Sequence, residues 1–263
     1  MLQFLKDTTF KANDVFRRAM KILKSHYISV AGLCFLLFVT SNLSTFLAVY
    51  LSDRTVGAVK VPLLLLFLTL FFGLQLILIK RAILLSQHVE HTKLRNYIPS
   101  FAQFLNFIFG LVMYSLLTGL VYLLISVLCF PLLYAGVSMD SLKLEINPFL
   151  TGVVMMLILI RISFFPFFIL EKQVNVFRSF RLSVALTRGN VINLLLLMLV
   201  LASAYFLQLG CEYMSYVYLA KFLSLINTFV IIPSVSLVMA IAYTNMMKDY
   251  HGGDDPRLFK NII

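Results

Sequence analysis

Residues 61–79 read VPLLLLFLTLFFGLQLILI, a run of 19 residues without a single charge. As a helix this run would extend about 28 Å at ~1.5 Å per residue, close to the thickness of the hydrocarbon core of a bilayer. The sequence therefore predicts a transmembrane helix here. Similar apolar runs lie at 27–51, 105–130, 148–170, 191–210 and 222–247.

Together the runs predict an all-α integral membrane protein with six transmembrane helices arranged as three hairpins. The composition agrees, because 61% of the 263 residues are hydrophobic and 13% are charged, with a mean hydropathy of +0.95. Soluble domains are roughly 45–50% apolar and about 25% charged. The segments between the runs are all shorter than a soluble domain of roughly 50 residues. We therefore expect one polytopic membrane domain over 1–263, without an appended catalytic domain.

The distribution of Lys and Arg predicts the topology. Seventeen of the 22 cations lie in the segments 1–26, 80–104, 171–190 and 248–263, four lie in the other loops, and Arg161 lies within a run. The positive-inside rule then places both termini in the cytoplasm, 248–263 being a cytoplasmic tail. Attraction to anionic lipid headgroups accounts for the net charge of +11, so we expect the phospholipid bilayer as a partner and no nucleic acid.

Residues 10–25 have the pattern of a basic amphipathic helix. Apolar side chains recur on one face, at Ala12, Val15, Phe16, Ala19, Met20 and Leu23. We expect this helix to lie in the cytoplasmic interface. The expected membrane-surface residues are Phe16, Arg17, Arg18, Lys21 and Lys24. Alternatively, the same face packs on the protein's own helices. No cleavable signal peptide is expected, so the first run reads as a retained anchor.

Two further cytoplasmic helices are predicted, a weak one within 80–104 and one over 172–188. The second is apolar on every side, which is typical of a buried helix, and Gly189 would end it. Phe-Arg-Arg-Ala at 16–19 and Phe-Arg-Leu-Ser at 180–183 share an offset of 164 residues. The chain thus reads as three units, each a cytoplasmic amphipathic or buried helix followed by a transmembrane hairpin.

Arg161 is the one charge inside an apolar run. If 148–170 is a single helix, this side chain lies about 13 Å from the nearer end, where an unpaired charge is costly. It is either a functional group at a gate, anchor or hydrated cavity, or a structural clamp. The clamp would bind helix-end carbonyls or one of the polar residues Asn42, Gln75, Gln208 and Asn227. Pro166 removes one helical hydrogen bond and predicts a kink nearby.

Residues that could support catalysis are few. His88, Glu90 and His91 have metal-ligand side chains, but Glu90 points away from the two histidines and no fourth ligand is near, so we expect no metal site. Cys34, Cys129 and Cys211 read as buried free thiols. The sequence has no phosphate-binding glycine loop and no nucleophile elbow. We expect neither an enzyme nor a cofactor.

A motif within 161–190 resembles a known family. Arg161 is followed by Pro166 and Glu171, then by Ser183, and Arg188-Gly189-Asn190 leads into the next apolar run. This resembles the YciC-like bacterial six-span proteins and the membrane domain found beside some glycerophosphodiester phosphodiesterases. The resemblance covers about 30 residues, and the phosphodiesterase catalytic domain is absent. It implies a bacterial inner-membrane protein of poorly defined envelope function, in which Glu171, Ser183, Arg188, Gly189 and Asn190 are motif residues.

These observations predict a non-enzymatic, multi-pass inner-membrane protein. It would act as a scaffold or accessory subunit beside other inner-membrane proteins, or in envelope lipid homeostasis. The alternative is a small transporter or channel with a polar path near Arg161. A transporter would need a hydrated route to both sides of the membrane, whereas a scaffold would have a filled core and an apolar flank.

Overall fold

A computed structural model describes residues 12–52, 57–87, 97–134 and 136–249. Every regular element in these ranges is a helix, and six helical stretches are long and apolar enough to cross a membrane. The chain is therefore an all-α multi-pass membrane protein, as the apolar runs predict. The six stretches are Ala12–Leu43, Val61–Ser86, Phe101–Leu133, Met139–Lys172, Val191–Tyr213 and Val217–Lys248.

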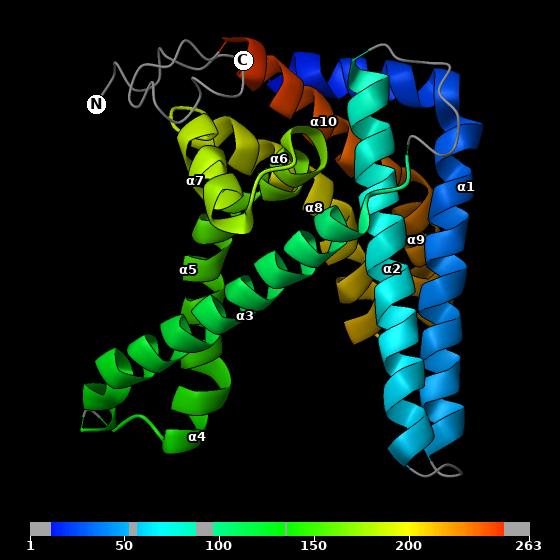
Figure 1. The fold of residues 1–263 in the computed structure, drawn as a ribbon. Helices are drawn as coiled ribbons and strands as arrows, with labels where there is room; N and C mark the ends of the chain where they lie inside the picture. The colour runs from blue at the N-terminus through cyan, green and yellow to red at the C-terminus, as the bar shows by residue number, and fades with distance from the viewer. Residues whose placement is uncertain (1–11, 53–56, 88–96, 135, 250–263) are drawn as a thin grey trace.

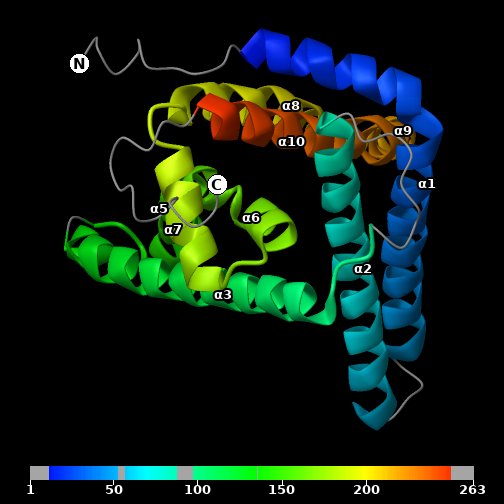
Figure 2. The ribbon, with the colours of Figure 1, turned by 45° about the horizontal axis from the view of Figure 1, so that its top comes forward.

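The first helix, α1 (Ala12–Ser52), bends at His26, where the backbone leaves helical geometry (φ −120°, ψ 21°). The segment before the bend lies crosswise to the rest of α1 and to α2 (Figures 1 and 2). The predicted N-terminal helix therefore exists, joined to the first span through a kink. Charges and apolar residues alternate with helical period up to this bend, and the sequence becomes apolar directly after it.

Helix α2 (Gly57–Ser86) continues through Lys80 without a break, so the separate helix predicted from residue 80 is wrong over 80–86. Lys80 Nζ donates to the carbonyl of Ile98 at 3.2 Å, and the Arg81 guanidinium donates to the hydroxyl of Tyr97. Both cations are thus accommodated by the segment that leads into α3 (Phe101–Cys129), and neither ends the helix. The remainder of the weak helix predicted within 80–104 falls largely outside the described residues.

Three short elements lie between α3 and the next long helix, α5 (Asn147–Ile162). They are η3 (Phe130–Leu133), α4 (Met139–Ser141) and the π-helical η4 (Leu142–Ile146). The predicted span 148–170 is not one helix, because α5 ends at Ile162 and a second helix, α6 (Phe165–Lys172), begins after a break. Helix α7 (Val176–Leu186) packs against α6.

Helix α7 is buried on one face only. Val176, Leu182 and Leu186 are buried, whereas Phe177 is 64% exposed and Val184 is also exposed. The prediction of a helix buried on every side is therefore wrong for the outer face. The positive φ of Gly189 (84°) follows α7, as expected of a helix stop.

The last hairpin is formed by α8 (Val191–Tyr213) and the continuous stretch of α9 (Val217–Ile226), the π-helical η5 (Asn227–Ile231) and α10 (Ile232–Asp249). Helix α10 packs against α1 and α2, whereas α9 packs on α8. The beginning of α1 and the end of α10 lie at the same end of the molecule (Figure 1).

The hydrophobic core lies at this end of the molecule, which we call the packed end. Its buried residues fall within 15–37, 74–85, 160–186, 194–201 and 237–246, together with Phe107. At the opposite end, which we call the open end, the α1–α2 hairpin and the α3–α5 pair diverge (Figure 1). A smaller cluster of Ile125, Cys129 and Leu142 holds the far end of α3.

Candidate functional site

The break between α5 and α6 lies at Ser163–Phe164. Pro166 has no N–H and falls in the first turn of α6, where a missing donor costs nothing. Phe164 (φ −94°, ψ 3°) lies outside helical geometry just before it. The predicted kink therefore exists, but it lies two to three residues before the proline. Backbone groups on both sides of the break lose their helical partners and need others.

Hydroxyl groups supply these partners. Ser183 Oγ accepts a hydrogen bond from the Phe164 N–H at 3.1 Å and donates to the carbonyl of Arg161 at 2.9 Å. Thr187 Oγ1 lies 3.3 Å from the same carbonyl, and Ser163 Oγ donates to Ile160 at 3.0 Å. Ser183 and Thr187 have no exposed surface. The side chains of α7 thus hold the broken backbone of the α5–α6 junction.

Arg161 lies in the last turn of α5 and is half-buried. The helix that contains it ends one residue later, so a single helix over 148–170 is wrong, whereas the depth of Arg161 within the candidate span Met139–Lys172 stays a prediction. Its carbonyl oxygen is the group that Ser183 and Thr187 bind. Two side chains suggested as its partners, Asn227 and Gln208, bond to each other at 2.6 Å. A role for its guanidinium stays a prediction.

Glu171 connects three helices at the far end of α6. Its carboxylate accepts hydrogen bonds from the hydroxyl of Tyr243 at 2.5 Å and from the side-chain amide of Gln87 at 2.9 Å. Tyr243, on α10, is 1% exposed, and its ring packs at 5.3 Å between centroids against both Phe167 and Phe168. The carboxylate therefore fixes α6 to α2 and α10 at the packed end.

A cavity of about 370 Å³ opens beside this carboxylate. The residues that line it are Gln87, Glu171, Lys172, Tyr243, Thr244, Met247 and Lys248. One carboxylate and two ammonium groups therefore share its wall. Next to it, the hydroxyls of Ser86 and Thr244 bond at 2.9 Å, which joins α2 to α10 a second time.

Gln103 completes the set of contacts around α6. The side-chain amide of this buried residue donates to the carbonyls of Leu170 at 3.0 Å and Ile169 at 3.4 Å. Its carbonyl oxygen accepts from the Ser100 N–H at 2.8 Å, as part of a capping box that starts α3. Both ends of α6 are thus held by side chains of other helices, Ser183 at its start and Gln103 at its end.

The other motif residues form the turn between α7 and α8. Asn190 is buried, and its carbonyl accepts the first backbone hydrogen bond of α8, from Leu194 at 3.0 Å. Gly189 supplies the left-handed backbone of the turn, and Arg188 is exposed. The structure therefore brings together Pro166, Glu171 and Ser183 around α6, and places residues 188–190 at the following turn.

The N-terminal helix packs on the protein through part of its apolar face. Val15, Ala19 and Leu23 are each less than 5% exposed, and the Arg18 guanidinium lies 3.4 Å from the carbonyl of Ser86. Of the expected surface residues, Phe16 is half-buried, and the exposed ones are Arg17, Lys21 and Lys24. The alternative of packing on its own helices is correct for these turns, and contact with the membrane surface stays a prediction.

Several residues of this site were not predicted. Ser100 and Gln103 have the Ser-x-x-Gln spacing of a capping box ahead of an apolar run, which could have indicated the start of α3. Gln87 and Tyr243 carry no local signal, because they are 84 and 72 residues from Glu171. Cys34, Cys129 and Cys211 are free and buried, as expected.

Comparison with protein-family models, curated proteins and solved structures found no match. Within the described residues, no group of three or more His, Cys, Asp or Glu could hold a metal ion, and residues 88–91 lie outside that part of the chain. The fold and the arrangement around α6 define the class, a multi-pass helical membrane protein, and the resemblance to the YciC-like family stays a proposal.

Proposed function

We propose that this chain is a non-enzymatic scaffold or accessory subunit of an inner-membrane complex, with both termini in the cytoplasm. The observation that supports it is the exposure of α2 at the open end. Leu64, Leu65 and Leu66 lie on three sides of this helix and are 53–62% exposed. Successive helical residues are separated by 100°, so within the described residues no face of α2 is fully covered here. A transmembrane helix of another protein would fit against this surface.

The polar residues of the packed end support the same proposal. Ser183, Gln103 and Glu171 each bond to another helix of the chain. Such contacts fix the relative positions of α3, α6, α7 and α10, as a rigid framework requires. The same polar groups in a transporter would have to exchange partners with a passing substrate.

Site-specific photo-crosslinking in cells tests this proposal. A photoreactive amino acid at Leu65 or Leu123 would probe the open end, and the same residue at Phe177 is the control. Leu123 and Phe177 are matched in exposure, at 65% and 64%, but Phe177 lies at the packed end. We expect one recurrent membrane protein crosslinked from the open end and absent from the control. Only lipid adducts at Leu65 and Leu123 would overturn the subunit proposal in favour of a role in lipid homeostasis.

The proposed orientation is tested separately by cysteine labelling. In a variant without Cys34, Cys129 and Cys211, single cysteines at positions 57, 90 and 255 would report on three segments. We expect an impermeant reagent outside spheroplasts to label position 57 and to leave positions 90 and 255 protected. Labelling of position 90 from outside would contradict cytoplasmic termini.

A further inference from the structure

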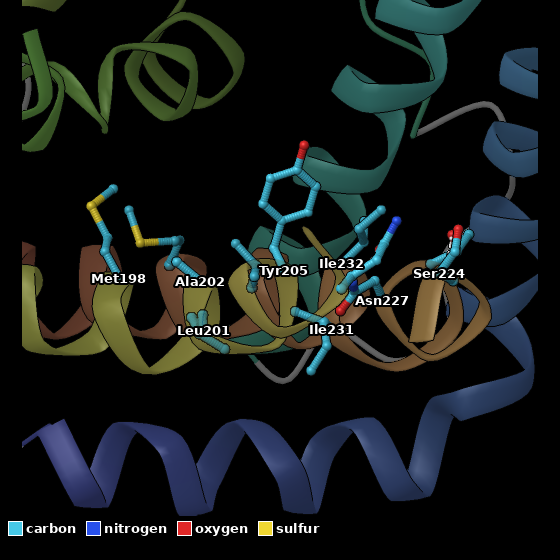
Figure 3. Close-up of a pocket in the computed structure, with 12 residues that line it drawn as sticks. Met198, Leu201, Ala202, Tyr205, Ser224, Asn227, Ile231 and Ile232 are labelled. Carbon is cyan, nitrogen blue, oxygen red and sulfur yellow. Dashed lines mark hydrogen bonds between the residues drawn. The ribbon is translucent and has the colours of Figure 1, made fainter. Parts of the chain in front are cut away.

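A second cavity, of about 460 Å³, lies between α8 and the stretch from α9 to α10, and it shares no residue with the cavity beside Glu171. Figure 3 shows the side chains of Met198 and Tyr205 projecting from the same side of α8. Both walls belong to stretches able to cross a membrane, so acyl chains are the surrounding solvent. The lining residues are Met198, Leu201, Ala202, Tyr205, Gln208, Ser224, Asn227, Thr228, Ile231, Ile232, Val235 and Met239.

The polarity of this cavity changes along α8. Met198 and Met239 lie at its apolar end, and methionine adapts readily to irregular apolar ligands. Gln208 is ten residues after Met198, so the cavity follows α8 for about 15 Å. At the Gln208 end, Asn227 Nδ2 donates to Gln208 Oε1 at 2.6 Å, and Gln208 Nε2 donates to Glu212 Oε1 at 2.8 Å. The cavity therefore has the apolar body and polar end of a site for an amphiphile.

The polar end has a hydrogen-bond acceptor that the described part of the chain does not satisfy. The Oδ1 atom of Asn227 is buried and has no hydrogen-bond donor within the described part of the chain. Asn227 also begins the π-helical turn η5, and single π turns are frequent at functional sites. Glu212 is exposed, and its Oε1 atom is bound by the amide of Gln208. A ligand group that donates several hydrogen bonds would fit this end.

The charges beyond the amide pair restrict the ligand further. Glu212 is four residues after Gln208, and Lys221 is six residues before Asn227. At ~1.5 Å per residue, both charges lie roughly 6–9 Å closer to the α8–α9 turn than the amides. One exposed carboxylate and one exposed ammonium thus accompany the polar end, and a headgroup that carries both charges complements them.

We propose that this cavity binds a phospholipid with a primary-amine zwitterionic headgroup of the phosphoethanolamine type. One acyl chain lies along α8 toward Met198 and Met239. The headgroup ammonium donates to the acceptors at Asn227 and Glu212, and Lys221 faces the phosphate. A choline headgroup lacks N–H donors, and a net anionic headgroup leaves Glu212 without a cationic partner. This inference is independent of the subunit proposal, because a lipid can fill the cavity whether or not another protein covers the open end.

Native mass spectrometry of the full chain tests the acyl-chain site. The protein would be purified in mild detergent with equal amounts of phosphatidylethanolamine, phosphatidylcholine and phosphatidylglycerol. Ala202→Phe places a ring in the cavity, and Ala204→Phe is its control, on the same helix but outside the lining. We expect Ala202→Phe to lower retained phosphatidylethanolamine about tenfold and Ala204→Phe to leave it unchanged. If Ala202→Phe retains as much phosphatidylethanolamine as the parent protein, the proposed site is wrong. Ala202→Leu fills less of the cavity and takes the place of the first variant if that variant fails to fold.

The headgroup is tested by competition among the same three lipids. We expect the parent protein to retain phosphatidylethanolamine about tenfold better than phosphatidylglycerol, and Glu212→Gln to remove most of this preference. Equal retention of all three lipids by the parent would overturn the headgroup assignment. An unchanged preference in Glu212→Gln would overturn the role of this carboxylate.

Discussion

The two ends of the molecule are built from similar sequences but are packed differently. Helix α2 carries leucines at both ends of the molecule, yet Leu76, Leu78 and Leu85 are buried whereas Leu64 and Leu66 are 59% and 62% exposed. The difference comes from what surrounds the helix. At the packed end α6 inserts beside α2, α3 and α10, and side chains from four other helices hold it in place. At the open end the described structure has no corresponding element.

This comparison shows how a membrane protein obtains a core without a hydrophobic driving force between its helices. Lipid chains solvate leucine as well as another helix does, so apolar surface alone does not bring helices together. The packed end is held by hydrogen bonds from Ser183, Gln103 and Glu171, and by the aromatic cluster around Tyr243. We infer that close packing between helices and polar contacts, more than apolar area, define the packed end.

The largest difference in stability is expected between two variants that each truncate a large side chain, one at the packed end and one at the open end. Phe168, with no exposed surface, contacts Tyr243 in the packed end, whereas Leu123 is 65% exposed. Phe168→Ala should lower the free energy of unfolding by about 3–5 kcal/mol because it leaves a cavity, and Leu123→Ala by less than about 0.5 kcal/mol. SDS titration in mixed micelles measures both values. Equal losses would show that the two ends are packed alike.

A smaller loss of stability is expected when the hydroxyl that bridges the helix break is removed. Ser183→Ala leaves the Phe164 N–H without its acceptor and the Arg161 carbonyl with only a longer contact, so it should cost about 2–3 kcal/mol. Ser179→Ala is the matched control, because within the described residues this buried hydroxyl of the same helix bonds only to the carbonyl of Val176. That variant should lose less than about 1 kcal/mol in the same titration. A control as unstable as Ser183→Ala would indicate a packing effect.

Two glycines of α3 give a third comparison. A Cβ atom at Gly110 would lie 2.6 Å from the ring of Phe165, whereas at Gly119 it would meet nothing within 4 Å. Gly110→Ala should therefore destabilise the protein by about 1–3 kcal/mol through overpacking. Gly119→Ala should be neutral or stabilising by up to about 1 kcal/mol, because alanine favours the helix. Thermal unfolding of both variants checks this, and a stable Gly110→Ala would mean that α6 moves freely against α3.

The sequence predicted the parts of this architecture that depend on local composition. Runs of 19 or more apolar residues indicate membrane helices, and the proline at 166 indicated a kink. The exact break was not predicted, because a proline in the first turn of a helix places the break before itself. The predicted span ended at residue 79, because charged residues such as Lys80 and Arg81 are typical of a loop. In the structure α2 continues past them, because the carbonyl of Ile98 and the hydroxyl of Tyr97 accept hydrogen bonds from these two side chains.

The partners in the candidate site could not be predicted from local patterns. Glu171 and Ser183 were selected through a resemblance, but their roles depend on Tyr243 and on the carbonyl of Arg161. These contacts connect residues 22 and 72 positions apart, and they exist only because α6 folds back into the bundle. One chain without aligned relatives provides no pairing information over such separations.

The smallest effect is expected at the N-terminal helix, where we propose that the packed end contacts the membrane surface. Lys21 is exposed on this helix, and a lysine near an anionic surface contributes up to about 1 kcal/mol. Lys21→Gln should therefore raise hydrogen exchange over 12–23 by up to about fivefold in nanodiscs with anionic lipid, and added salt should remove the difference. Leu23, which is 4% exposed, provides the apolar comparison. Leu23→Ala should raise exchange by more than Lys21→Gln at every salt concentration, because burial of apolar surface is not screened.

The two variants separate the two ways in which this helix can be held. An effect of Lys21→Gln that depends on the charge of the lipid requires that the helix lies close to lipid headgroups, since no contact inside the protein would respond to the lipid charge. The same measurement in nanodiscs of purely zwitterionic lipid is the control, and the effect should disappear there. If Lys21→Gln exchanges like the parent protein in anionic nanodiscs at low salt, the helix is held by Val15, Ala19 and Leu23 alone. The proposed contact with the membrane surface would then be wrong.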